Sequence, residues 1–147
     1  MIKVIAILIV TLLAFVSCAQ LSELPPTAKD AFALPDRSTR STQVETFIAG
    51  NDLAKAMDAA EYALDSVLFE SRPESWTPER RCGEYTTGMY DWAMWGCFYF
   101  LPDSDGILKG RVVVESWNSF GVTTNKPWSV MLVSAFRNRM EMIAGTK

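Results

Sequence analysis

The sequence predicts a domain built largely from helices, because three segments place apolar residues three or four positions apart. The first segment, residues 53–69, has this spacing at Leu53, Ala56, Met57, Ala60, Leu64, Val67 and Leu68. The second, in the most apolar part of the chain after the N-terminus, has it at Tyr85, Met89, Trp92 and Gly96. The third follows Pro127 and has it at Leu132, Phe136, Met140 and Ile143. Each segment is therefore expected to turn one apolar face toward a common core.

Composition limits the functions that the chain can have. With 147 residues, 49% of them hydrophobic, the chain is long enough to bury the core of one domain. The net charge is −3 with no long run of either sign, which argues against nucleic acid as a partner. The absence of histidine removes imidazole bases, most catalytic triads and the usual zinc sites. We therefore expect a protein that is not an enzyme and that holds no cofactor or metal.

Residues 1–18 have the features of an export signal. Lys3 precedes an apolar run, residues 4–16, that is shorter than the roughly 20 residues of a membrane-spanning helix. Two processing routes are open after Val16. In one, Cys18 is acylated and becomes the first residue of a lipoprotein; in the other, signal peptidase cleaves after Ser17-Cys18-Ala19. We favour lipidation of Cys18, with an uncleaved anchor as the remaining alternative. Both cleavage routes place the chain on the periplasmic side of a bacterial envelope.

Two cysteines remain once Cys18 is lipidated or removed, namely Cys82 and Cys97. In an oxidising compartment their pairing would stabilise the fold by about 3 kcal/mol. A straight helix over this segment would instead hold the two residues about 22 Å apart, beyond the reach of a disulfide. Either the helix breaks, at Gly88 or Gly96, or the bond does not form, and the sequence leaves both possibilities open.

Residues 19–42 are predicted to be a flexible linker, because Pro25, Pro26 and Pro35 interrupt any regular element. A tether of about 24 residues would let the domain stand on the order of 25–30 Å from a membrane. The folded domain is expected at residues 43–143.

Two helix starts are predicted next. Thr42-Gln-Val-Glu45 is a capping-box pattern that predicts a short helix, which Gly50 would end. Asn51 or Asp52 can then cap the helix that begins near Leu53.

The segment from Tyr99 to residue 118 fits two structures. An Asp-Gly pair at residues 105–106 and three consecutive valines favour a β-hairpin. A helix ending at Pro102, followed by one that starts near Ser104 or Asp105, is the alternative. Asp103 and Asp105 also look like a fragment of a calcium loop, but the remaining ligand positions are missing and a plain turn is expected.

Four short patterns occur in a defined order. They are Gly50-Asn51-Asp52-Leu53, then Cys82-x-x-Tyr85-x-x-Gly88-x-x-Asp91, then Leu101-Pro102, then Pro127 followed by Leu132-Val133-x-Ala135. In this order they resemble the Rap/Tai family, periplasmic immunity proteins against peptidoglycan amidases delivered by type VI secretion. The resemblance covers about residues 47–142. It implies a small all-α bundle of about five helices, with residues 106–118 as one of them.

The same resemblance implies a function. Such a protein, often a homodimer, would bind its cognate amidase effector and occlude the catalytic cleft. Specificity would come from a few central anchors and from charge, and a mature charge of −4, from 13 basic and 17 acidic residues once Lys3 is lost, suits a basic effector. Candidate partner-binding residues are Trp76, Arg80, Asp103, Ser104 and Asp105.

Two other classes of function remain open. The chain could be a lipid-anchored envelope scaffold that uses the same domain without a toxin partner. It could also be a glycan-active enzyme that uses Glu84, Asp91 or Glu115 beside the tryptophans. That chemistry needs two carboxylates at a suitable separation, and no spacing in the sequence aligns two of them.

Overall fold

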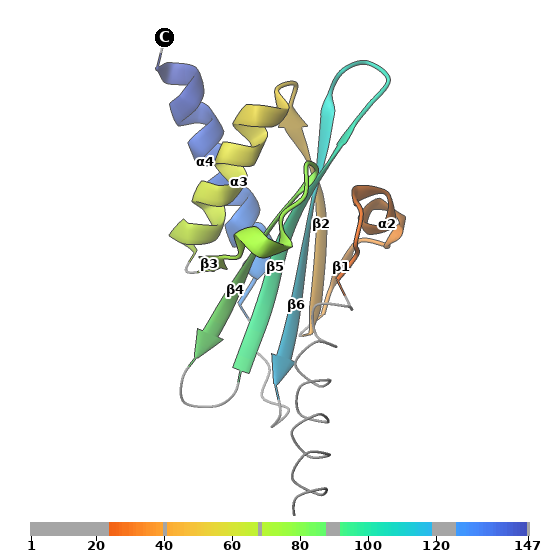
Figure 1. Ribbon diagram of the computed structural model, residues 1–147, viewed down its shortest axis with the longest axis vertical. Coiled ribbons are helices and arrows are strands. Elements are labelled where there is room, and N and C mark those ends of the chain that lie inside the picture. Colours follow the sequence, from red (N-terminus) through yellow and green to blue (C-terminus); the bar gives the residue numbers. More distant parts are fainter. Residues whose placement is uncertain (1–23, 40, 68, 88–91, 119–125, 147) are drawn as a thin grey trace, which may run out of the picture.

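The computed structural model describes residues 24–39, 41–67, 69–87, 92–118 and 126–146, which form a mixed α/β domain. Its centre is a six-stranded antiparallel sheet in the order β1-β2-β6-β5-β4-β3 (Figure 1). The prediction of an all-α bundle is therefore wrong. The strands are β1 (Arg37–Ser38), β2 (Thr42–Gly50), β3 (Glu70–Ser71), β4 (Arg80–Thr87), β5 (Trp92–Pro102) and β6 (Leu108–Asn118). The helices are α2 (Ala28–Ala33), α3 (Leu53–Ser66) and α4 (Trp128–Gly145), with a 3-10 turn, η1 (Pro73–Ser75).

Strands β5 and β6 form a long hairpin. Gly106, with φ of 75°, lies in the turn, where the amide of Asp103 donates to the carbonyl of Ile107 at 2.7 Å. The hairpin alternative for residues 99–118 is thus correct, and the helix at 106–118 that the family resemblance implied is wrong. Val112, Val113 and Val114 alternate between the two buried faces of the sheet, an environment that β-branched side chains fill well.

The helix predicted from the spacing of Tyr85, Met89, Trp92 and Gly96 is wrong. The pattern misled because β5 is buried on both of its faces. Met94, Phe98 and Phe100 belong to the core on one side of the sheet. Trp95, Cys97 and Tyr99 belong to the core on the other. A strand covered on both sides is apolar throughout and shows no alternation, so periodicity alone does not distinguish it from a buried helix.

The capping-box pattern at Thr42 also forms a strand. Residues 42–48 of β2 pair with Glu115 to Lys109 of β6, and the Thr42 hydroxyl donates to the Glu115 carboxylate at 2.9 Å. The predicted short helix is therefore wrong. The following helix start is confirmed, because the side chain of Asp52 accepts a hydrogen bond from the amide of Lys55 at 3.1 Å and caps α3.

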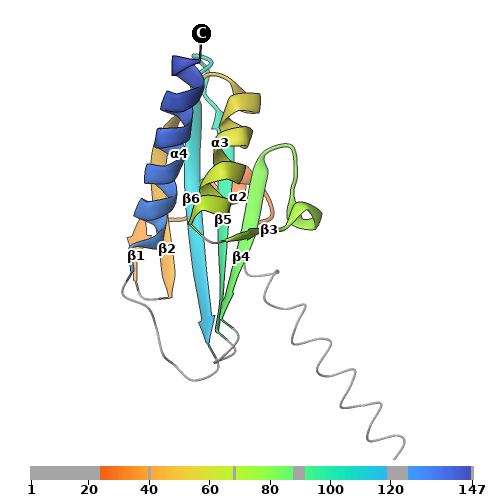
Figure 2. The ribbon, with the colours of Figure 1, turned by 90° about the vertical axis from the view of Figure 1, so that its left-hand side faces the viewer.

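Helices α3 and α4 cover one face of the sheet; Figure 2 shows them in front of it. The buried side of α3 is rich in alanine, which allows a close approach of its neighbours: Ala56, Ala59, Ala60 and Ala63 are all fully buried. From α4, Leu132, Val133 and Phe136 enter the same core. The two helices predicted at residues 53–69 and after Pro127 are confirmed.

A buried amide fixes the start of α4. The Gln43 side chain donates to the carbonyl of Lys126 at 2.9 Å and accepts from the amide of Ser129 at 2.9 Å. Because Gln43→Leu leaves both main-chain groups without this partner, we expect the free energy of unfolding to fall by about 2 kcal/mol. Urea unfolding measures the change, and the exposed Arg37→Ala is a control that should stay within about 0.5 kcal/mol of wild type. Equal losses in the two variants would contradict this role.

The opposite face of the sheet is covered by residues 24–36, which we call the N-terminal strap (Figure 1). Leu24, Ala28 and Ala31 are buried there, with 3%, 0% and 0% of their surfaces exposed. The described part of the segment expected to be a flexible linker, residues 19–42, therefore contains α2 and β1 instead. Pro25 and Pro26 precede α2 and do not interrupt it, and the Thr27 side chain caps the helix by accepting from the amide of Asp30.

Candidate functional site

The strand register places side chains in rows across the side of the sheet that faces the strap, and two adjacent rows contain the disulfide and the strap-binding groups. One row consists of Val44, Val113, Cys97 and Cys82. The adjacent row, nearer the β5–β6 turn, consists of Thr46, Arg111, Tyr99 and Arg80. We call these eight residues the disulfide face.

Cys82 and Cys97 form a disulfide, with an S–S distance of 2.01 Å and a Cα–Cα distance of 4.2 Å. The two residues lie directly opposite each other on β4 and β5. The separation of about 22 Å calculated for a straight helix does not apply, because the chain reverses direction between two adjacent antiparallel strands. Both residues are buried beneath the strap and belong to the same apolar cluster as Leu24, Ala28 and Ala31.

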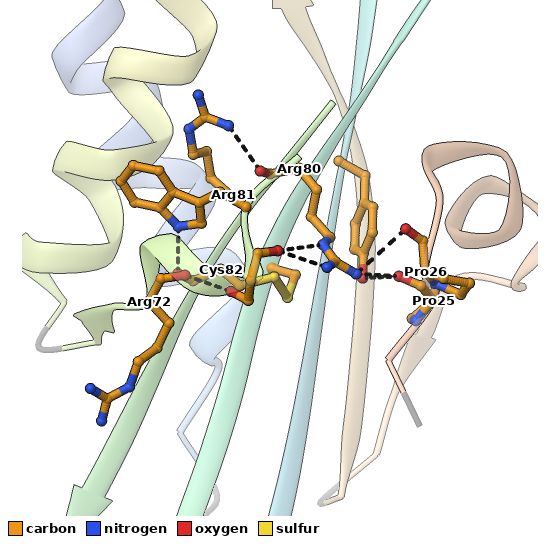
Figure 3. The surroundings of a disulfide bond; sticks show 10 residues. Pro25, Pro26, Arg72, Arg80, Arg81 and Cys82 are labelled. Carbon is orange, nitrogen blue, oxygen red and sulfur yellow. Dashed lines mark hydrogen bonds between the residues drawn. A yellow bond between two sulfur atoms is a disulfide. The ribbon is translucent and has the colours of Figure 1, made fainter. Parts of the chain in front are cut away.

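Arg80 holds the first end of the strap (Figure 3). Its Nη1 donates to the carbonyl oxygens of Pro25 and Pro26 at 3.2 and 3.5 Å, while its Nε and Nη2 donate to the carbonyl of Ser75 at 3.0 and 2.7 Å. The Tyr99 hydroxyl donates to the same Pro25 carbonyl at 2.7 Å. The arginine predicted to bind a partner thus links the strap to the loop that precedes β4.

Arg111 holds the other end of the strap. Its guanidinium donates to the carbonyl of Leu34 and, at 2.6 Å, to the hydroxyl of Thr46, and it pairs with Asp36 at 3.1 Å. The side chain stacks on the ring of Phe32, with the guanidinium carbon 5.7 Å from the ring centroid. Arg111 is 5% exposed, and the strap and β2 supply its ion pair and hydrogen bonds, while its buried Nε has no hydrogen-bond partner among the described residues.

The buried phenol of Tyr99 makes strap docking sensitive to alkaline pH. Burial raises the pKa of Tyr99 above its ordinary value of 10.0, although the nearby Arg80 acts in the opposite direction. A raised folded-state pKa contributes stability that is complete below pH 10 and is lost as pH rises through the folded value.

We therefore expect Tyr99→Phe to lower the free energy of unfolding by about 1 kcal/mol at pH 8, because the bond to Pro25 is lost. This difference should shrink above pH 10, where wild type loses stability through Tyr99 and the variant does not. Urea unfolding at pH 8 and pH 10.5 measures it, with the exposed Tyr62→Phe as the matched control. A wild-type advantage that stays constant with pH would contradict the prediction.

Trp76, the second predicted partner-binding residue near the disulfide, has a structural contact too. Its indole nitrogen donates to the carbonyl of Cys82 at 3.0 Å, and the guanidinium carbon of Arg81 lies 4.7 Å from the indole ring (Figure 3). Arg81 also pairs with Glu61 of α3 at 2.8 Å. These contacts fix the loop that carries Ser75, and through Arg80 they support the strap.

The three predicted residues Asp103, Ser104 and Asp105 lie apart from this group, in the β5–β6 turn. The turn begins four residues beyond Tyr99 along β5, roughly 13 Å away. Asp103 pairs with Lys109 at 3.1 Å, and this contact, with the hydrogen bonds from Ser104, lowers the pKa of the Asp103 carboxyl. The turn therefore places one carboxylate with a lowered pKa, that of Asp103, at one end of the sheet.

The motif residues that carried the family resemblance have local structural roles where the structure describes them. Gly50 has a φ of 98° at the end of β2, and Asn51, Asp52 and Leu53 follow as the turn and start of α3. The amide of Lys55 lowers the pKa of Asp52. Tyr85 packs on Phe69 and Trp128 in the helix-side core, and Pro102 ends β5. Cys18, Gly88 and Asp91 lie outside the described residues.

The sheet aligns two of the carboxylates considered for an enzyme. Glu84, Trp95 and Glu115 occupy one row on adjacent strands, with the tryptophan between the carboxylates. Glu84 pairs with Arg72 at 3.1 Å, while Glu115 accepts from Thr42. Trp95 is 9% exposed, so its ring offers little surface on which a sugar could stack.

Sequence reasoning missed Arg111 and Tyr99, the residues that complete the disulfide face. Arg111 could have been found from the sequence, because it directly precedes three valines that favour a strand. A charged residue in such an apolar strand is buried only when it has partners. Tyr99 carried none, because its role depends on which face of β5 the strap covers.

Comparison of the chain with models of known protein families gives no match, and comparison with curated proteins gives none either. Across the described ranges, no helix combines the length and the apolar character needed to cross a membrane. Within those same ranges, no three His, Cys, Asp or Glu side chains are grouped so that they could hold a metal ion.

Proposed function

We propose that this chain is an exported binding domain that performs no chemistry and is held at the periplasmic side of a bacterial envelope through its N-terminus. The buried disulfide between Cys82 and Cys97 carries the proposal, because such bonds persist in oxidising compartments and are rare in the cytosol. The export signal at residues 1–18, with Cys18 as the proposed site of lipidation, supports the same location.

The chemistry of the charged groups favours binding over catalysis. A catalytic general acid needs a raised pKa, whereas Asp52 and Asp103, among the described residues, have lowered ones. Arg80 and Arg111 hold main-chain carbonyls of the strap and are occupied in doing so. These groups build and orient a surface.

A peptidoglycan amidase effector delivered by type VI secretion is the first partner to test, and occlusion of its cleft is the mechanism to test with it. The family resemblance suggested this partner, but it also implied an all-helical fold that the chain does not have. We therefore base the binding function on the disulfide and the charged groups, and we keep the amidase as a specific candidate.

The test uses the mature chain purified from the periplasm and the amidase encoded in a neighbouring reading frame. We expect the two proteins to elute as one complex and the release of peptide from cell-wall sacculi to stop. Binding to an envelope machine and to no toxin would replace the amidase with a scaffold role. Release of sugar or peptide from sacculi by the chain alone would contradict a binding function. Mass spectrometry of the mature N-terminus distinguishes an acylated Cys18 from a chain that begins further on.

A further inference from the structure

The hydrogen bonds from the sheet and the loop before it to the first half of the strap reach main-chain atoms of the strap. Arg80 and Tyr99 donate to the carbonyls of Pro25 and Pro26, and the Glu79 carboxylate accepts from the amide of Ala28 at 3.2 Å. None of these hydrogen bonds involves a side chain of the strap, so they do not depend on its sequence. Another segment with the same backbone path would satisfy the same groups.

The side chains that the strap buries are few and small. Leu24, Ala28 and Ala31 are its fully covered apolar residues, while Phe32 is only partly buried. Helix α2 has six residues, too few to be stable in isolation. Ordering each residue costs roughly 1–2 kcal/mol, so a segment with so few buried contacts belongs to the parts of a fold that open most easily.

Much of the surface beneath the strap, between the two arginines, is apolar. Val44, Cys97, Tyr99 and Val113 are 5%, 0%, 0% and 0% exposed with the strap in place. Lifting the strap would expose these four side chains together, and an apolar patch of that kind on a soluble domain marks a site of protein interaction. Because this exposure is unfavourable in water, we expect another segment to cover the disulfide face once the strap has been displaced.

We propose that the disulfide face is the binding surface of the domain. In the free protein the strap covers this surface, and a partner protein displaces the strap with a segment of its own that makes the same contacts. This segment has small side chains at positions i and i+3, matching Ala28 and Ala31, and a carboxylate five positions further on to pair with Arg111 as Asp36 does. The inference rests on the proposed binding function and names the surface that performs it.

The test uses the full mature chain with a strap that cannot dock. Ala31→Asp places a carboxylate on the buried side of α2, within the apolar cluster that includes Cys97 and Val113, whereas Ala33→Asp places the same group on the exposed side of the same helix. A fluorescent synthetic peptide with the wild-type sequence of residues 24–36 is then titrated into each variant. Circular dichroism and thiol counting show whether the sheet and the disulfide are intact.

We expect the Ala31→Asp chain to keep its sheet and disulfide and to bind the peptide at least ~10-fold more tightly than the Ala33→Asp chain. In the Ala33→Asp chain, the tethered strap competes with the peptide for the disulfide face at a high effective concentration. A peptide that itself carries Ala31→Asp should bind neither chain. The proposal is overturned if the Ala31→Asp chain loses its sheet, or if it binds the wild-type peptide no better than the Ala33→Asp chain does. No amidase is present, so this result is independent of whether that partner is correct.

Discussion

Replacing Cys82 and Cys97 together with alanine is expected to lower the free energy of unfolding by at least about 3 kcal/mol. The disulfide closes a loop with a sequence separation of 15, and removing it restores that conformational freedom to the unfolded chain. The two sulfurs also fill space beneath α2, where both residues are almost completely buried, so their loss adds a packing cost. Denaturant unfolding of the mature protein measures the change.

The wild-type protein in dithiothreitol is the matched control for the double variant. Since both samples lack the bond, both midpoints should lie below that of the oxidised protein, and the variant should unfold at or below the midpoint of the reduced wild type because it also lacks the two buried sulfurs. Thiol counting on protein from the periplasm should find Cys82 and Cys97 unavailable before reduction. Two free thiols in that sample would contradict the assignment of the compartment. Equal midpoints for the oxidised and reduced protein would contradict the stabilising role of the bond.

Gly110→Ala is expected to cost about 3 kcal/mol, near the upper end for overpacking in a core. A Cβ atom at this position of β6 would lie 2.3 Å from Cζ of Phe47, with two further ring atoms at 2.5 and 2.8 Å. The ring cannot move aside easily, because its centroid lies 4.9 Å from that of Phe136 and 6.1 Å from that of Phe98. Thermal unfolding should show a clearly lower midpoint.

Gly145→Ala is the control for this change. Apart from its chain neighbours and the nearby backbone of α4, no heavy atom of the described residues lies within 4 Å of the position of its Cβ, and alanine has the higher helix propensity at the end of α4. We expect Gly145→Ala to be neutral or slightly stabilising. If Gly110→Ala is equally well tolerated, the packing of Phe47 across β6 is not as described.

The sequence predicted the secondary structure correctly where a local pattern and its tertiary setting agree. Residues 53–66 and 128–145 have one apolar side and one polar side, and both form helices packed on the sheet. The Asp-Gly turn before Val112 likewise forms the hairpin that local propensity favoured.

The sheet as a whole was missed because its central strand lacks alternation. Layers cover β5 on both sides, one including Phe98 and the other Cys97, so the strand is apolar throughout. For residues 106–118, local propensity favoured the hairpin, which is correct, but the family resemblance implied a helix. Its short patterns, such as the glycine turn at Gly50 followed by the cap Asp52, also fit a strand that ends where a helix begins. Such patterns specify turns and caps, and they do not specify what precedes them.

The candidate site was found only in part, for a related reason. Arg80, Trp76 and the two cysteines were named from the sequence, but as a loop surface and an uncertain pair. The strand register that aligns Cys82 with Cys97, and Arg80 with Tyr99 and Arg111, depends on contacts between distant segments. No local pattern encodes the docking of the strap on that surface.

Hydrogen exchange of the intact, oxidised mature chain, followed by mass spectrometry, tests most directly whether the disulfide face is a binding surface with a displaceable occupant. The amides of Ala31 and Leu34 donate within the strap, to Thr27 and to Ala31. If the strap opens on its own, these amides should exchange on the order of 100-fold faster than those in the middle of β5 and β6. If they exchange as slowly as β5 and β6, the strap opens only when the whole domain unfolds, and the disulfide face is then a permanent part of the core.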